Sequence, residues 1–157
     1  MKQGLRYFQI DTDRYQDRKV KKLKKAFGCA GLAIYDYVLC EVYRVDGCGL
    51  VWDDDTAFDV ADYFGLKVTT VKEVVKYCGA VGLFDAELLS RGIITSEAIQ
   101  KRYVEMCNRA RRPNIEIPEE IRLFTQKTEK LRKNSEETQK ITQVFDKVNN
   151  SKVNKND

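Results

Sequence analysis

Residues 59–78, DVADYFGLKVTTVKEVVKYC, contain two runs of helical periodicity that are separated by Gly65. Glycine readily adopts the left-handed conformation in which helices commonly end, so we expect the chain to reverse direction at this residue. Ala61 lies four residues before the glycine, and Val71 and Val74 follow it at helical spacing. A small residue, a glycine and apolar residues in this order are typical of a helix-turn-helix. An ordinary helical corner in a small core would give the same pattern.

The length of 157 residues suits one domain with its own hydrophobic core. No apolar run approaches the roughly 20 residues that a membrane-spanning helix requires. The N-terminal sequence MKQGLRYFQID lacks the apolar centre of a secretory signal. We therefore expect a cytoplasmic protein with no membrane partner.

Cysteine and histidine usage argues against metal binding and catalysis. The five cysteines are widely spaced and include no Cys-x-x-Cys pair, so we interpret them as small apolar residues. The chain has no histidine, which removes the commonest general base and the commonest metal ligand. No glycine-rich phosphate loop or nucleophile-base pair is visible either. The sequence predicts a protein that is not an enzyme and has no cofactor and no metal site.

The N-terminal half predicts a short strand and two helices. Residues 7–10, YFQI, alternate weakly, as a strand would. A lysine-rich amphipathic helix is expected to follow and to end near Gly28. A longer helix is expected over residues 32–45, where Ile34, Val38, Val42 and Val45 make an apolar stripe, and we expect this helix to be the best buried in the core.

The C-terminal half predicts the remaining elements. Residues 50–52 are a β-prone run, and Asp54, Asp55 or Thr56 can cap the helix that ends at Phe64. Thr70 and Glu73 have capping-box spacing at the start of the next helix. A ribbon is expected to pair residues 83–84 with 93–95 around a turn at 90–92, which we interpret as a wing. Ser96 can cap a last helix, which Pro113 ends.

Together these elements predict a mainly α fold with a small β-ribbon. Its expected architecture is a winged helix-turn-helix with an extra N-terminal helix and a C-terminal helix, over residues 1–112. Residues 113–157 are rich in Lys, Asn, Gln, Glu, Ser and Thr, so we expect a polar tail that is partly disordered or a solvated helix. Agreement between caps, turns and apolar spacing is stronger evidence than any one of them.

Double-stranded DNA is the partner that this architecture predicts. The residues expected at base edges in the major groove are Thr69, Thr70, Lys72 and Lys76, with Lys67 on a phosphate. Arg91 is expected at the wing tip. The basic run RKVKKLKK, residues 18–25, predicts a non-specific phosphate grip by Lys19, Lys21, Lys22 and Lys25. Each of these side chains could equally belong to a solvated polar surface.

The residues also carry a family resemblance. It includes the aromatic-rich start YFQI, Asp17 before the basic Lys19-Val20-Lys21, the pair Gly28 and Gly31 before the tyrosine-rich helix, and the segment from Ile94 to Tyr103. Over roughly residues 5–112 the chain resembles the N-terminal domain of phage replisome organisers and DnaD-like primosomal proteins. The resemblance implies a winged-helix domain of a replication-initiation protein, which binds origin DNA or assembles with itself and with primosome or helicase-loading proteins. It does not imply catalysis.

Two other functions fit the same fold. One is an interaction module that self-associates as a homo-oligomer, because the chain has eight tyrosines and aromatic residues are enriched at interfaces. The other is a transcriptional regulator. A salt titration of DNA binding separates DNA binding from the interaction module, because phosphate contacts make affinity fall steeply with salt.

Overall fold

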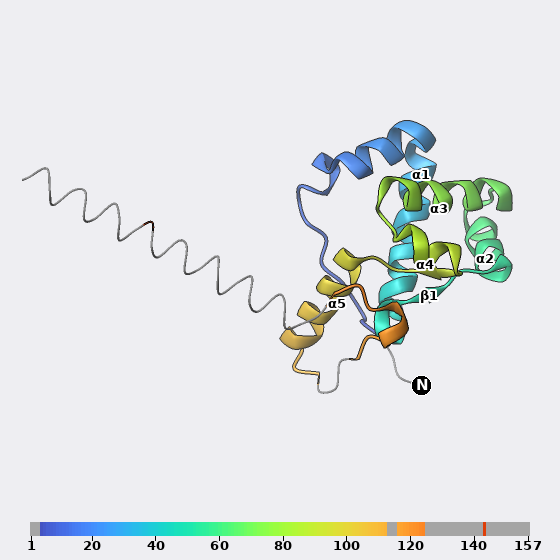
Figure 1. Cartoon of the computed structure of the whole chain (residues 1–157). Coiled ribbons are helices and arrows are strands. Elements are labelled where there is room, and N and C mark those ends of the chain that lie inside the picture. Colours follow the sequence, from blue (N-terminus) through green and yellow to red (C-terminus); the bar gives the residue numbers. More distant parts are fainter. Residues whose placement is uncertain (1–3, 113–115, 125–142, 144–157) are drawn as a thin grey trace, which may run out of the picture. The chain divides into compact units, whose positions relative to one another are not determined.

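The computed structural model describes residues 4–112, 116–124 and 143, and it is mainly helical with one two-stranded sheet, as the sequence predicts (Figure 1). The elements are η1 Arg14–Gln16, α1 Arg18–Arg44, η2 Asp46–Cys48, β1 Leu50–Val51, α2 Asp54–Phe64, α3 Val68–Val81, α4 Ala86–Ser90, β2 Ile93–Ile94, α5 Glu97–Arg109 and η3 Glu119–Ile121. Residues up to Leu123 form one compact unit. The polar tail expected beyond that unit lies, except for residues 124 and 143, outside the described residues.

Helix α1 is broken at Gly28, close to where the sequence predicts that its first helix ends. Gly28 has φ 66° and ψ −153°, a conformation that is essentially restricted to glycine. The two halves therefore run in different directions, with Val20 and Leu23 buried in the first half. In the second half Ile34, Val38 and Val42 are fully buried, which confirms the predicted core stripe as far as Val42. Val45 is the extended C-cap residue after the end of the helix and is only half-buried, so its place in the stripe is wrong.

By length and composition, α1 is the one helix among the described residues that resembles a membrane span. Its break at Gly28 leaves neither half long enough to cross a bilayer as a continuous helix. Its apolar stripe packs inside the protein. A core helix passes such a test as readily as a membrane span does, so the helix is weak evidence for a membrane.

The prediction of a strand over residues 7–10 is wrong, because the structure has no strand there. This segment runs alongside helices α1 and α5, which offer no sheet edge to pair with. It is instead tied down by individual contacts. The Leu5 N–H donates to the Tyr43 carbonyl at 2.7 Å, the Phe8 ring stacks on Tyr43 with centroids 4.5 Å apart, and the Gln9 N–H contacts Met106 Sδ at 3.4 Å.

Helices α2 and α3 form the predicted helix-turn-helix corner around Gly65. This glycine is left-handed, with φ 66°, and its N–H faces the Ala61 and Asp62 carbonyls at the end of α2. The Leu66 N–H also reaches the Ala61 carbonyl, at 2.9 Å. Val71 and Val74 of α3 are fully buried. The reversal of direction and the valine-lined packing surface are confirmed.

Two predicted caps are wrong by a few residues. The cap of α2 is Asp53, whose carboxylate accepts the Thr56 N–H at 2.8 Å, because α2 begins at Asp54. Helix α3 begins at Val68, so its N-cap is Lys67 and no side chain caps it. Thr70 thus lies inside the helix, where it cannot form the predicted capping box with Glu73.

The ribbon exists, but its strands differ from those predicted. Strand β2 pairs antiparallel with β1, with Leu50 opposite Ile94, and residues 83–84 are not a strand. Helix α4 occupies the region where the wing was expected. The Asp85 carboxylate caps it by accepting the Leu88 N–H at 2.9 Å, and Leu88 is buried, so a cap and an apolar anchor favour a helical turn here.

Helix α5 begins as predicted, since Ser96 Oγ accepts the Ile99 N–H at 3.1 Å. It ends at Arg109, before Pro113. Residues 116–123, beyond the expected domain end at residue 112, contact this helix. Gln100 is fully buried, and its amide donates to the Ile121 carbonyl at 2.7 Å and accepts the Leu123 N–H at 2.8 Å.

Candidate nucleic-acid interface

The outer face of α3 carries three of the four side chains that the sequence predicts at base edges in the major groove. Thr69, Lys72, Glu73 and Lys76 are exposed and lie on the side opposite the buried valines. Their spacing of three and four residues places them in one row along the helix. Thr70 is only half-buried and lies at the edge of this row. We call Thr69, Lys72 and Lys76 the α3 face.

Lys67 lies at the N-terminal end of the α3 face. It is the exposed N-cap residue of the helix. The first N–H groups of a helix carry partial positive charge, so a cation at this position adds to an attraction for phosphate. An anion at the start of α3 would therefore meet both Lys67 and these N–H groups.

The first half of α1 packs beside α3, and Figure 1 shows the two helices as neighbours. The rings of Phe27 and Tyr77 meet edge to face, with centroids 5.5 Å apart. The Tyr77 hydroxyl donates to the Lys22 carbonyl at 3.4 Å, a long hydrogen bond. Lys19 Nζ donates to the Gly82 carbonyl at 3.3 Å. The basic run therefore lies next to the C-terminal part of the helix-turn-helix.

The basic run presents one row of cations to solvent. Arg18, Lys21, Lys22 and Lys25 are exposed and recur at helical spacing, opposite the buried Val20 and Leu23. We call these four residues the lysine face. Lys19 lies beside this row and is engaged with Gly82. Arg18 was missing from the predicted set, although its spacing from Lys21, Lys22 and Lys25 was visible in the sequence.

Carboxylates limit the positive field around the α3 face. Lys72 Nζ forms an ion pair with Asp54 of α2, at 2.5 Å, and both side chains are largely exposed. The neighbouring Asp53 has its pKa lowered by the hydrogen bonds that it accepts from the N–H and hydroxyl of Thr56. Asp53 therefore stays ionised near neutral pH. A phosphate that approaches Lys72 must compete with the Asp54 carboxylate.

Arg91 does not lie at a wing tip, and this part of the prediction is wrong. It is the C-cap residue of α4, with its N–H facing the Glu87 and Leu88 carbonyls. The side chain is exposed. Because residues 86–90 are helical, Arg91 is not carried on an extended hairpin that could reach a minor groove away from α3.

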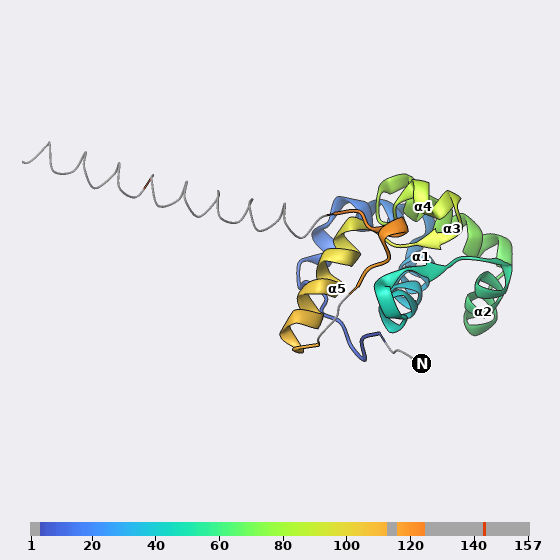
Figure 2. The same ribbon diagram turned by 60° about the horizontal axis from the view of Figure 1, so that its bottom comes forward.

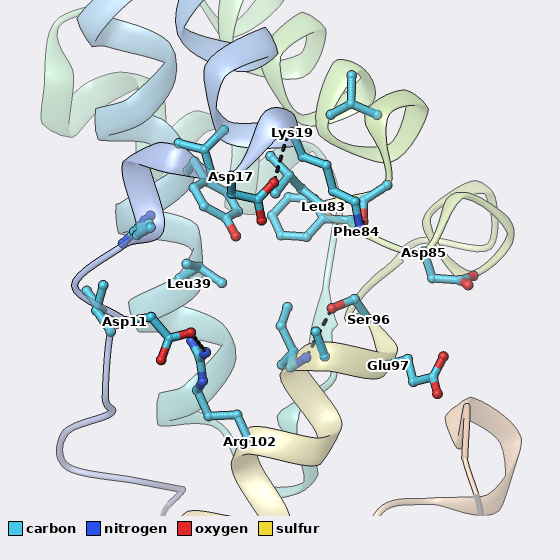
Figure 3. A pocket seen from close by; sticks show the side chains of 18 of the residues that line it. Asp11, Asp17, Lys19, Leu39, Leu83, Phe84, Asp85, Ser96, Glu97 and Arg102 are labelled. Atoms are coloured by element: carbon cyan, nitrogen blue, oxygen red, sulfur yellow. Dashed lines mark hydrogen bonds and ion pairs between the residues drawn. The ribbon is translucent and has the colours of Figure 1, made fainter.

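An open groove of about 1050 Å³ lies between the N-terminal segment, α1, the α3–α4 connection and the start of α5 (Figure 3). Several of its charged groups are engaged with the protein itself. Asp11 pairs with Arg102 at 2.7 Å, and Asp17 accepts the Lys19 N–H at 2.8 Å. Burial raises the pKa of Tyr35, on its wall, to about 12, although the Arg14 guanidinium opposes this shift. The tyrosine is thus a neutral packing residue rather than a base.

No group of three His, Cys, Asp or Glu side chains in the described part of the chain is placed to hold a metal ion. The three most buried thiols, those of Cys48, Cys78 and Cys107, have their pKa raised by burial, the opposite of an activated nucleophile.

Comparisons with known proteins give one family and one relative. The sequence profile of the "Lin1244/Lin1753-like, N-terminal" family matches residues 7–99. The chain is 29% identical over 113 residues to the "Uncharacterized phage-related protein Lin1244/Lin1753" of Listeria innocua serovar 6a. This match covers 71% of the chain and 37% of the relative, so the chain spans little more than a third of the relative's length. No solved structure matches the chain.

Proposed function

The chain belongs to the Lin1244/Lin1753-like family, and from this premise we propose that it is a phage-related, non-catalytic protein that binds double-stranded DNA. In this proposal it acts in the cytoplasm as a winged-helix-type module of replication initiation, similar to replisome organisers and DnaD-like proteins. Primosome or helicase-loading proteins would be its protein partners.

One observation carries the proposal. The first half of α1, which carries the lysine face, lies beside α3, so this face and the two lysines of the α3 face come from distant parts of the sequence and lie on neighbouring helices. A helix-turn-helix reads DNA by placing its second helix in the major groove while other groups contact phosphates. The α3 face would supply the groove contacts, and the lysine face would supply sequence-independent phosphate contacts.

The salt dependence of duplex binding tests this function. Each lysine that contacts a phosphate contributes about 0.9 to the slope of log affinity against log salt concentration. We expect Lys72→Ala with Lys76→Ala to lower that slope by up to about two units. The measurement is fluorescence anisotropy with a labelled random duplex at several salt concentrations.

A matched control removes two cations elsewhere. Arg44 and Arg109 are exposed and paired with Glu41 and Glu105 on their own helices. Arg44→Ala with Arg109→Ala makes the same change in net charge, so it should leave the slope nearly unchanged. If both double variants lower the slope equally, the decrease is caused by the change in net charge and not by lost contacts on the α3 face. If the unaltered protein does not bind duplex at low salt, the proposal is wrong, and the self-association alternative gains support.

A further inference from the structure

Helix α2 presents an acidic face whose side chains form no ion pair or hydrogen bond with a described residue. Asp55, Phe58, Asp59 and Asp62 are exposed and occupy one row, opposite the buried Ala57, Val60 and Ala61. We call these four residues the acidic face. Helix α2 lies at the edge of the molecule in both views (Figures 1 and 2). The ion pair of α2 with Lys72 uses Asp54, which lies outside this row.

An apolar group lies within this row of carboxylates. The Phe58 side chain is 58% exposed, and the neighbouring Tyr63 is 70% exposed. Tyr63 leans against Tyr37 and Phe64, with ring centroids 5.2 and 5.0 Å apart, so the aromatic surface continues from α2 onto α1. Exposed aromatic rings that lie next to charges of one sign are suited to a partner that brings aliphatic stems with charges of the opposite sign.

The lysine face of α1 has these properties, since its side chains combine aliphatic stems with positive charges. The lysine face has four cations at positions i, i+3, i+4 and i+7 of α1, and the acidic face has three carboxylates and a phenylalanine at the same spacing on α2. The two rows are on different helices, so one molecule can offer both at once. We propose that the acidic face of α2 binds the lysine face of α1 in a second copy of the chain, in a head-to-tail contact.

The physical chemistry of this contact sets its strength and its form. The lysine stems would cover Phe58 while their ammonium groups meet the aspartates, and a cation over an aromatic ring is itself attractive. A contact between single helices lies at the small end of specific interfaces, so the association is weak and screened by salt. Because the two surfaces differ, an associated pair leaves one acidic face and one lysine face free, so further copies can add until a ring closes.

Sedimentation velocity over a range of protein concentrations, at low and high salt, tests the contact. DNA is left out, so the result does not depend on the proposed function. The expected result is a sedimentation coefficient that rises with concentration at low salt and not at high salt. Asp59→Lys with Asp62→Lys reverses the acidic face and spares the α2 cap, and it should weaken association about tenfold or more. Lys21→Glu with Lys25→Glu should do the same from the other side.

A mixture of the two variants separates charge matching from misfolding. In the mixture, the lysine face of the first variant meets the intact acidic face of the second, and the two reversed faces also complement each other. The contact therefore predicts that the mixture associates although each variant alone does not. Glu87→Lys with Asp13→Lys changes two exposed acids elsewhere and should leave association intact.

Four results would overturn the proposal. Three of them are a protein that stays monomeric at low salt and high concentration, a mixture that fails to associate, and an equal loss in the Glu87 and Asp13 control. Association that survives both face reversals would assign self-association to a different surface, and would also reject this contact.

Discussion

At the scale of single residues, Gly28 and Gly65 set the direction of the chain through their backbone conformation and not through close packing. A methyl group built at Gly28 or at Gly65 meets nothing within 4 Å. Both residues nevertheless have φ 66°, which side chains rarely adopt. Replacing either glycine therefore costs free energy through backbone strain. Replacing Gly79 would instead cause a steric clash, because an added methyl group would lie 2.8 Å from Leu89 Cδ2.

Gly65→Ala isolates the conformational cost at the corner. We expect it to lower the free energy of unfolding by about 1–2 kcal/mol, because alanine is strained in the left-handed region. Gly65→Asn should cost less, because asparagine tolerates this conformation better. Urea denaturation measures both, with Asp62→Ala as the neighbouring exposed control. If alanine and asparagine cost the same, strain at φ is not the cause.

The raised pKa values of two buried thiols predict that the free energy of unfolding depends on pH in the alkaline range. Burial raises the pKa of Cys48 and of Cys78 to about 12, from an ordinary value of 9.0. Between these values the unfolded chain loses both protons and the folded chain keeps them, so stability falls as pH rises. We expect a slope of roughly 1 kcal/mol per pH unit for each thiol.

Urea denaturation under reducing conditions, from pH 8 to about pH 11, measures that slope. Cys48→Ala with Cys78→Ala should make the fall shallower, even though the cavities lower stability at every pH. Cys29→Ser, at an exposed position, should leave the slope unchanged. A double variant with the original slope would show that other groups, such as the buried Tyr35 and Tyr103, cause the loss.

At the scale of elements, the ion pair between Asp54 of α2 and Lys72 of α3 engages a lysine that we propose contacts DNA. Asp54→Asn removes the competing carboxylate from Lys72, so we expect duplex affinity to rise a few-fold at low salt. Stability should change by less than about 1 kcal/mol, because the pair is exposed and Asp53 provides the cap. The measurements are fluorescence anisotropy and thermal unfolding.

Asp55→Asn is the matched control, since it makes the same charge change one residue away on the same helix. Asp55 has no ion pair with a described residue. Its removal should raise affinity less than that of Asp54. An equal rise in both variants would mean that general charge repulsion, and not the ion pair, limits binding.

Elements were predictable from sequence where local chemistry decides, and were not where a distant partner decides. Gly65, the buried valines of α3 and the Ser96 cap depend on neighbours in the chain, and each was predicted. The pairing of β1 with β2 brings together residues about 40 positions apart, which no local pattern reveals. Helix α4 was missed because the cap Asp85 and the anchor Leu88 resembled part of a hairpin.

In the candidate interface, too, the features set by nearby residues were predictable and those set by distant contacts were not. The exposure of Thr69, Lys72 and Lys76 follows from helical spacing and was predicted. The position of the lysine face beside α3 depends on contacts made by Phe27 and Tyr77, 50 positions apart in the chain. Arg18 was omitted because the run was read by composition and not by its row on the helix.

At the scale of the whole molecule, one buried side chain joins the C-terminal segment to the core. The Gln100 amide contacts Ile121 and Leu123, and the side chains of Ile117 and Ile121 are buried. The segment from residue 116 to 123 is therefore part of the folded unit. A chain cut at residue 112 would expose the surface that these residues cover.

Gln100→Ala tests this connection. It leaves the Ile121 carbonyl and the Leu123 N–H without their partner, which costs roughly 1–3 kcal/mol. We also expect faster hydrogen exchange at the Leu123 amide than at amides inside α3. Gln100→Glu keeps an acceptor for the Leu123 N–H, so that amide should stay more protected than in Gln100→Ala. Equal exchange in both variants would contradict the assigned contact.

The separation of charge between α1 and α2 also gives the molecule a permanent electric dipole. A net charge of +4 therefore understates how strongly the protein interacts with charged matrices. We expect solubility to rise with the first additions of salt, because counterions screen attraction between opposite poles of neighbouring molecules. At neutral pH and low ionic strength, both cation-exchange and anion-exchange resins should retard the protein.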